Sequence, residues 1–132
     1  MLAVSEPSSG SGPRERAEAH PLVRRIGNTP LVELPRLAPG PVRLFAKLEG
    51  ANPGGSVKDR AARAMVLDAL SRGALERCRL LDASSGNTGI AFAMLGAALG
   101  FGVTICLPGS ASPERKRILR AYGAEVIETD AL

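Results

Sequence analysis

Apolar residues recur in two alternating patterns along this chain, from about residue 29 onwards. Short apolar runs bounded by proline, glycine or other turn residues predict strands. Longer runs, in which apolar positions recur at steps of three and four, predict amphipathic helices. The predicted strands span residues 31–34, 42–49, 80–83, 103–107 and 124–128. The predicted helices span residues 56–72 and 87–99, with a third from Ser112 to just before Gly123.

Strands and helices alternate through most of this pattern. Gly73 and Gly100 are placed to end the first two helices, and Ser112-Pro113 is a typical start for the third. Such alternation indicates βαβ units, in which the strands of one sheet run parallel. We therefore predict an α/β fold whose parallel sheet is covered by helices on both faces, a three-layer αβα arrangement.

The segment from Gly89 to Leu107 is almost entirely apolar and long enough to suggest a membrane span. However, Gly100-Phe101-Gly102 divides it into a helix and a strand, because glycine pairs of this kind mark turns. A helix buried against a sheet can also be apolar on all sides. We therefore expect two elements of a folded core and no membrane partner.

The composition is that of a globular protein. Hydrophobic residues make up 45% of the 132 residues, which is enough for one domain with a core. The net charge of +4 comes from basic and acidic residues spread along the chain. With one Tyr and three Phe for base stacking, we expect no nucleic-acid partner. Cys78 and Cys106 have neither metal-ligand nor disulfide spacing, so we expect no metal site.

Residues 1–21 differ from the rest of the chain. They contain Ser, Gly, Pro, Glu and Arg with few large apolar residues, a composition that predicts a disordered tail. The segment lacks the apolar core of a signal peptide, and its acidic residues argue against an organelle transit peptide. We therefore expect a cytoplasmic protein whose folded part spans residues 22–132.

One lysine occupies an unusual position in the pattern. The run Asn52-Pro53-Gly54-Gly55 is turn chemistry, since both glycines can adopt positive φ, and Ser56 can cap the helix that follows. Lys58 then falls in the first turn, where the positive end of the helix dipole disfavours a protonated amine. Schiff-base chemistry requires a neutral amine, because only that form attacks a carbonyl. These residues alone leave a second interpretation open, in which Lys58 is a solvated surface residue.

A second polar stretch, Ser84-Ser85-Gly86-Asn87-Thr88-Gly89, also lies between a predicted strand and a predicted helix. Hydroxyls and backbone N–H groups at a helix N-terminus can bind an anion. The two serines can equally serve only as helix N-caps. Together with residues 52–60, this stretch resembles the N-terminal signatures of the cysteine synthase (O-acetylserine sulfhydrylase) and cystathionine β-synthase family.

Members of that family are fold-type II enzymes that depend on pyridoxal phosphate (PLP). Residues 26–32, 112–115 and 121–125 resemble further motifs of the family. The resemblance runs from about Leu22 to the last residue, in order and with family-like spacing. It implies that the chain is the N-terminal part of the fold-type II PLP enzyme fold.

The resemblance assigns roles to the polar residues of both stretches. Lys58 would hold PLP as a Schiff base and then remove the α-proton of the substrate as a general base. Asn87 matches the residue that hydrogen-bonds the 3′-oxygen of PLP. The residues that match the loop closing on the substrate carboxylate are Ser84, Ser85, Gly86 and Thr88. Asp59 and Arg60 follow the lysine, and we interpret them as an ion pair that fixes the start of the helix.

The implied reaction is β-replacement, in which sulfide displaces the leaving group of O-acetylserine, or of a related activated serine, to form L-cysteine. Ser56-Val57-Lys58 and Asn87-Thr88 resemble sulfhydrylases and cystathionine synthases more than amino-acid dehydratases of the same fold type. A cystathionine β-synthase-like enzyme is the alternative, and the opening motif favours cysteine synthase. The implied partners are an amino-acid substrate and sulfide, with a homodimer if the chain is full length.

The family is substantially longer than this chain. Its Gly-rich loop for the PLP phosphate and its partner for the pyridine nitrogen lie beyond the region of resemblance. We therefore expect an N-terminal half with an incomplete cofactor site and weak PLP binding in isolation. A second hypothesis is a non-catalytic fragment that needs a partner chain. Half of such a fold also leaves apolar faces uncovered, which predicts self-association.

Overall fold

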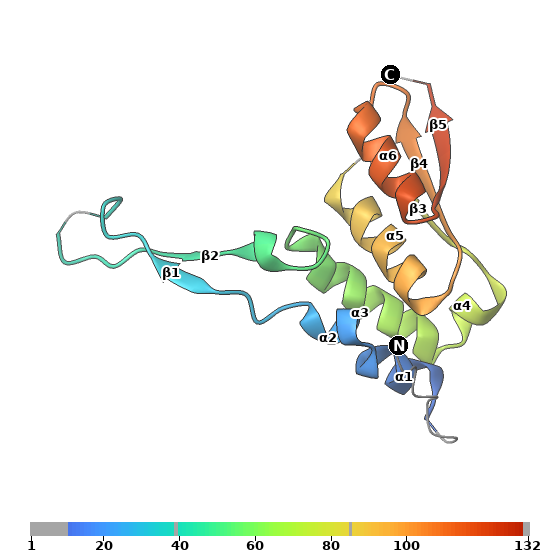
Figure 1. Cartoon of the computed structure of the whole chain (residues 1–132), viewed down its shortest axis with the longest axis horizontal. Coiled ribbons are helices and arrows are strands. Elements are labelled where there is room, and N and C mark those ends of the chain that lie inside the picture. Colours follow the sequence, from blue (N-terminus) through green and yellow to red (C-terminus); the bar gives the residue numbers. More distant parts are fainter. Residues whose placement is uncertain (1–10, 39, 85, 131–132) are drawn as a thin grey trace, which may run out of the picture.

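The computed structural model describes residues 11–38, 40–84 and 86–130. A hairpin of two strands extends away from the main body, which holds the other strands and the helices (Figure 1). The helices are α1 (Pro13–Ala19), α2 (Pro21–Arg25), α3 (Lys58–Ser71), α4 (Ala74–Arg77), α5 (Asn87–Leu99) and α6 (Pro113–Ala121), with a 3-10 turn, η1 (Glu49–Ala51). The strands are β1 (Leu31–Glu33), β2 (Phe45–Lys47), β3 (Leu80–Ala83), β4 (Val103–Pro108) and β5 (Glu125–Thr129).

Strands β3, β4 and β5 form a parallel sheet with β4 in the centre. Helix α5 connects β3 to β4, α6 connects β4 to β5, and the two helices pack together on one side of the sheet (Figure 1). The predicted α/β class is therefore confirmed, and the predicted bounds of β3 and α5 match those of the structure. The strand register places Leu81 and Ile127 on the opposite face, where their side chains are 68% and 43% exposed.

Strands β1 and β2 differ from the prediction. The sequence predicts a strand over residues 42–49 within a sheet covered on both faces, whereas β2 spans only Phe45–Lys47 and pairs antiparallel with β1. Within the described residues this pair is a separate sheet, so β2 pairs only with β1, a short strand bounded by prolines. The register places Leu31 and Phe45 on the same face of the hairpin, and their exposures of 62% and 43% show that this face is not covered.

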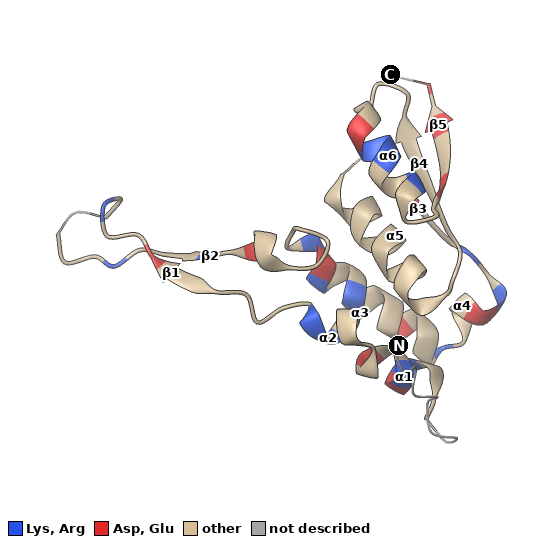
Figure 2. Cartoon of the chain, viewed as in Figure 1, with Lys and Arg blue, Asp and Glu red and all other residues tan. Residues whose placement is uncertain are grey.

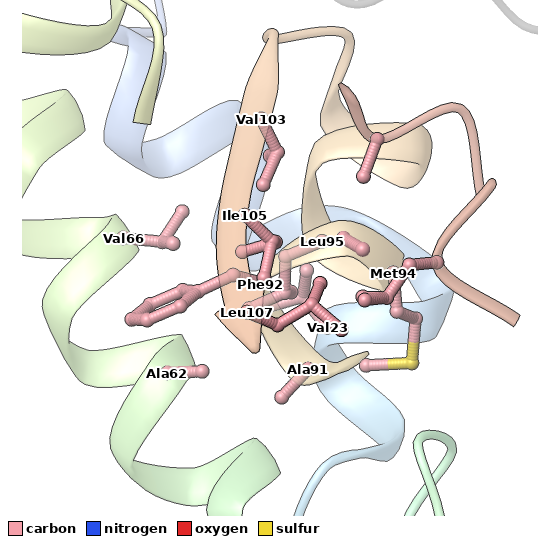
Figure 3. Close-up of a cluster of buried hydrophobic side chains, with 13 residues drawn as sticks. Val23, Ala62, Val66, Ala91, Phe92, Met94, Leu95, Val103, Ile105 and Leu107 are labelled. Atoms are coloured by element: carbon pink, nitrogen blue, oxygen red, sulfur yellow. The ribbon is translucent and has the colours of Figure 1, made fainter. Parts of the chain in front are cut away.

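The hydrophobic core lies between α3, α5 and β4 (Figure 3). Val66 of α3 lies near Phe92 of α5, and Ile105 and Leu107 of β4 belong to the same cluster. Helix α5 carries no charged residue, as its tan ribbon in Figure 2 shows, and its burial accounts for the long apolar run in the sequence. Among the described residues, no helix has the length and apolar character that crossing a membrane requires.

The N-terminal segment also differs from the predicted disordered tail. Residues Pro13–Ala19 form α1, which packs against α3 and buries Ala17 to 4% exposure. Burial of Ala17 against α3 stabilises this helix despite its polar composition, and two local features add to it: proline at the first position and an Arg14–Glu18 ion pair one turn apart. Residues 1–10 lie outside the described residues, and for them the tail stays a prediction.

Candidate active site

The lysine stretch forms a turn that leads directly into α3. Lys58 is the first residue of this helix, and its backbone N–H donates to Ser56 Oγ over 3.1 Å. The predicted contribution of Ser56 is therefore present, although Val57 occupies the N-cap position. The Lys58 side chain is exposed, and within the described part of the chain its amine has no hydrogen bond or ion pair. This amine is accessible to a molecule arriving from solution.

The two glycines before Ser56 serve different purposes. Gly55 has a φ of +82°, a value that glycine adopts without strain. Gly54 does not have a positive φ, and it is required for space instead, because a Cβ at this position would lie 2.5 Å from Asp59 Oδ1. The positive φ that the sequence allows at both glycines is thus used at Gly55 alone.

Asp59 and Arg60 do not pair with each other, so the predicted ion pair is wrong. Consecutive residues of a helix do not face one another. Asp59 is buried, and its Oδ2 accepts a hydrogen bond from the Gly54 N–H. Arg60 makes a two-pronged ion pair with Glu49, with Nε 2.8 Å from Oε2 and Nη2 3.0 Å from Oε1. The start of α3 is therefore tied to the chain that precedes it at two separate points.

Glu49 is the centre of a hydrogen-bonded cluster that the sequence did not reveal. Thr29 Oγ1 donates to Glu49 over 2.9 Å and accepts from Arg60, while Asn52 Nδ2 donates to Glu49 over 2.8 Å. The hydrogen bond from the Arg60 guanidinium lowers the pKa of Glu49 to about 2. Burial acts in the opposite direction, whereas the hydrogen bonds from Asn52 and Thr29 lower this pKa further. Asn52 Oδ1 also accepts from the Gly27 N–H over 2.8 Å.

This Glu49 cluster joins the opening motif, turn η1 and the start of α3 into one unit. The available sequence signal was the presence of polar Thr29 and Asn52 inside two motifs. Both residues are almost fully buried, at 5% and 4% exposure. Their common partner, Glu49, is the last residue of a predicted strand and carries no signal of its own.

The second polar stretch forms the start of α5. Ser84 Oγ accepts from the Gly86 N–H over 3.4 Å and from the Gly89 N–H over 3.3 Å, although Gly86 and not a serine occupies the N-cap position. Asn87 is the first residue of α5 and is exposed, whereas Thr88 is half-buried. Neither the Asn87 amide nor the Thr88 hydroxyl has a partner within the described residues. Ser85 lies outside them, and its role stays a prediction.

Helices α3 and α5 pack against each other and begin at the same end of the pair (Figure 1). Lys58 and Asn87 are thus the first residues of two neighbouring helices whose positive ends lie on the same side. An accessible amine, an amide and a hydroxyl with unused hydrogen-bonding capacity fit a carbonyl cofactor that carries a ring oxygen and anionic groups, such as PLP.

The fold and these side chains define a class of protein, and comparison with known sequences identifies it. Residues 22–131 match the family model of pyridoxal-phosphate-dependent enzymes, so the chain belongs to this family. PLP is the cofactor of the family. The matched region begins at Leu22, where the resemblance in the sequence also begins.

Individual proteins of known sequence or structure are similar to this chain over most of its length. The cysteine synthase of Aquifex aeolicus is 52% identical over 116 residues, which cover 84% of this chain and 36% of that protein. The cystathionine beta-synthase of Saccharomyces cerevisiae is 43% identical, over 83% of this chain and 23% of that protein. The crystal structure of a cysteine synthase from Entamoeba histolytica superposes with a TM-score of 0.79 at 37% identity, covering 98% of this chain and 38% of that one. The chain therefore spans well under half the length of each of these proteins.

Proposed function

We propose that this chain is the lysine-bearing part of a PLP-dependent enzyme that forms L-cysteine by β-replacement. Sulfide would displace the leaving group of O-acetylserine or of a related activated serine. The observation that carries the proposal is the accessible Lys58 amine at the start of α3, beside the start of α5. The 52% identity to a cysteine synthase supports the choice of reaction.

The residues of both helix starts have distinct tasks in this proposal. Lys58 would carry the cofactor through a carbon–nitrogen bond, and its amine is also the group that would accept the substrate α-proton. Bound PLP supplies an electron sink for negative charge at the α-carbon. Asn87 would donate a hydrogen bond to the ring 3′-oxygen.

The start of α5 would bind the substrate carboxylate. A helix N-terminus offers backbone N–H groups and partial positive charge, which favour an anion. The Thr88 hydroxyl and the Gly86 backbone belong to this site, with Ser85 between Gly86 and Ser84. Ser84 uses only acceptor capacity in capping α5, so its O–H can still donate to a carboxylate.

A cystathionine β-synthase-like reaction is the second candidate, supported by the 43% identity to the yeast enzyme. It would use the same lysine and a larger thiol in place of sulfide. A third candidate is a non-catalytic fragment that needs a partner chain. A homodimer and a cytoplasmic location form part of the first proposal through the likeness to the family.

The proposal is tested by adding PLP to the purified chain, recording the visible absorption, reducing with borohydride and mapping the labelled peptide. Because the isolated chain is expected to bind PLP weakly, the cofactor is added in large excess, and we then expect a lysine-linked absorption band with label on Lys58, and neither in Lys58→Ala. Lys116→Arg is the matched control, because Lys116 pairs with Glu128 on a different part of the fold. Turnover of O-acetylserine with sulfide, compared with a larger thiol, separates the two reactions. Label spread over Lys47 and Lys116 would contradict a dedicated site.

A further inference from the structure

A buried carboxylate directly follows Lys58 and has no task in the proposed chemistry. Asp59 is 0% exposed. Its Oδ2 accepts a hydrogen bond of 2.5 Å from the Gly54 N–H. Its Oδ1 is buried and has no hydrogen-bond partner within the described part of the chain. Buried carboxylates are rare unless both oxygens are satisfied, so this arrangement requires an explanation.

The surroundings of Asp59 oppose its negative charge. Burial raises the pKa of the Asp59 carboxyl, the hydrogen bond from Gly54 acts in the opposite direction, and the nearby charge of Glu49 adds to the increase. The position therefore destabilises an ionised side chain. The hydrogen bond from the Gly54 N–H is the contact through which the carboxylate reaches the turn.

The turn that precedes Lys58 is held both by residues before the helix and by a residue within it. On one side, the Asn52 carbonyl accepts from the Gly55 N–H over 2.8 Å, and Ser56 Oγ accepts from the Lys58 N–H. On the other side, the Asp59 carboxylate lies so close to Gly54 that a Cβ there would be 2.5 Å from Oδ1. The backbone that carries the reactive amine is thus held by Ser56, two residues before Lys58, and by Asp59, the residue after it.

We propose that Asp59 is a positioning residue, which holds the Gly54 peptide against the start of α3 and so fixes the backbone from which Lys58 reaches its cofactor. This inference rests on the proposed function of Lys58 and deepens it. Asp59 faces the protein interior while Lys58 faces solvent, so it acts through the turn and not on the reacting atoms.

Two substitutions of Asp59 distinguish a positioning role, which needs the hydrogen-bond acceptor, from a role that depends on the volume or the charge of the side chain. Asp59→Asn keeps an oxygen that can accept from the Gly54 N–H, whereas Asp59→Ala removes it. We expect the rate at which PLP and borohydride label Lys58 to fall about tenfold or more in Asp59→Ala, because small misplacements of a reacting group have large effects. Asp59→Asn should stay close to the wild type. Asp68→Asn is the matched control, an exposed carboxylate on the same helix that pairs with Arg72.

Gly54→Ala provides an independent measurement of the same contact. In the wild type the added methyl would collide with Asp59, so labelling of Lys58 should slow. In the Asp59→Ala background the space is open, so the double variant should label no more slowly than Asp59→Ala alone. Non-additivity of this kind is the signature of two groups in direct contact. Additive losses in the double variant would overturn the inference.

The outcomes distinguish this inference from the function on which it rests. The inference is overturned if Asp59→Ala is labelled at the wild-type rate. It is also overturned if the labelling rate falls equally in Asp59→Ala and Asp59→Asn and the fall matches the loss of thermal stability in each variant. If Lys58 of the wild type takes no label, the proposed function fails. Hydrogen exchange at the Gly54 and Lys58 amides then tests whether Asp59 positions the turn. Faster exchange at both amides in Asp59→Ala, but not in Asp59→Asn, supports the positioning role of Asp59, and unchanged exchange overturns it.

Discussion

The surroundings of Glu49 and Asp59 shift the pKa values of these two carboxyl groups in opposite directions. The Arg60 guanidinium holds Glu49 ionised, whereas burial raises the pKa of Asp59. Glu49 therefore acts as one partner of an ion pair that joins η1 to α3, and Asp59 acts as an acceptor inside the turn. At the scale of single residues, the side chains that hold the lysine are distinct from the amine that would react.

The substitution Glu49→Gln should destabilise the fold in a pH-dependent way. The folded-state pKa of Glu49, about 2, lies below its ordinary value of 4.5, so the ionised form stabilises the folded chain. This contribution is fully present above pH 4.5 and is lost as the pH falls towards 2. Urea midpoints of wild type and Glu49→Gln should therefore differ at neutral pH and converge through this window.

Glu33→Gln is the matched control for that experiment. Glu33 makes a similar two-pronged pair with Arg43, at 2.9 Å for both contacts, on the exposed hairpin. Exposed ion pairs contribute little to stability, so this variant should remain close to the wild type at neutral pH. A difference between wild type and Glu49→Gln that stays constant with pH would contradict the ion-pair account.

At the scale of elements, α5 closely approaches the start of β4 at Gly96. A Cβ at this position would lie 2.5 Å from Val103 Cγ2 and 2.9 Å from the Phe101 carbonyl oxygen. Gly100, with a φ of +81°, ends the same helix in the left-handed conformation. The two glycines thus have separate structural tasks, one in packing and one in termination.

Gly96→Ala should lower the melting temperature of the chain. Overpacking of a core typically costs about 1–3 kcal/mol. Alanine is favoured over glycine in a helix by about 1 kcal/mol, which offsets only part of that loss. Thermal unfolding followed by circular dichroism measures the net effect, with Ala97→Ser on the exposed side as control. A Gly96→Ala variant as stable as the wild type would show that the helix can move away from β4 without loss.

Elements with a complete local signal could be predicted from the sequence, and those that depend on distant neighbours could not. Helix α5 has an apolar run and a glycine at its end, and its bounds were predicted correctly. Helix α1 lacks an apolar stripe and forms because Ala17 is buried, and the length of β2 is set by its partner β1. These features depend on packing partners that a local pattern does not contain.

The same distinction applies to the candidate site. Turn residues and caps placed Lys58 and Asn87 at helix starts, and the structure has them there. The pairing of Glu49 with Arg60 could not be predicted, because it depends on how η1 returns the chain to α3. The contact between Asp59 and Gly54 depends on the rotation of one side chain into the interior. Both are three-dimensional arrangements of residues that the motifs contain or adjoin.

At the scale of the whole molecule, exposed apolar side chains occur on the hairpin and on the open face of the sheet, including Leu31, Phe45, Leu81 and Ile127. Exposed apolar groups on strands with unpaired edges promote association. We therefore expect the purified chain to self-associate, with an apparent mass by light scattering that rises with concentration.

Replacing Leu81 and Ile127 together by threonine should reduce this association, because it removes apolar surface without altering the covered face of the sheet. Met65→Gln is the control, since Met65 is 57% exposed but belongs to helix α3 and not to a strand. A wild-type chain that remains a monodisperse monomer at all concentrations would contradict the expectation.

The hairpin has a fixed base and an exposed far end. At the base, the Lys47 amine donates to the Thr29 carbonyl, and Thr29 belongs to the Glu49 cluster. Towards the far end, Leu37 and Val42 are 70% and 67% exposed. Because the free energy of closing a loop grows slowly with its length, the connection between β1 and β2 can gain or lose residues without displacing Lys58. Insertions and deletions can therefore change the reach of this arm during evolution while the reactive amine stays in place.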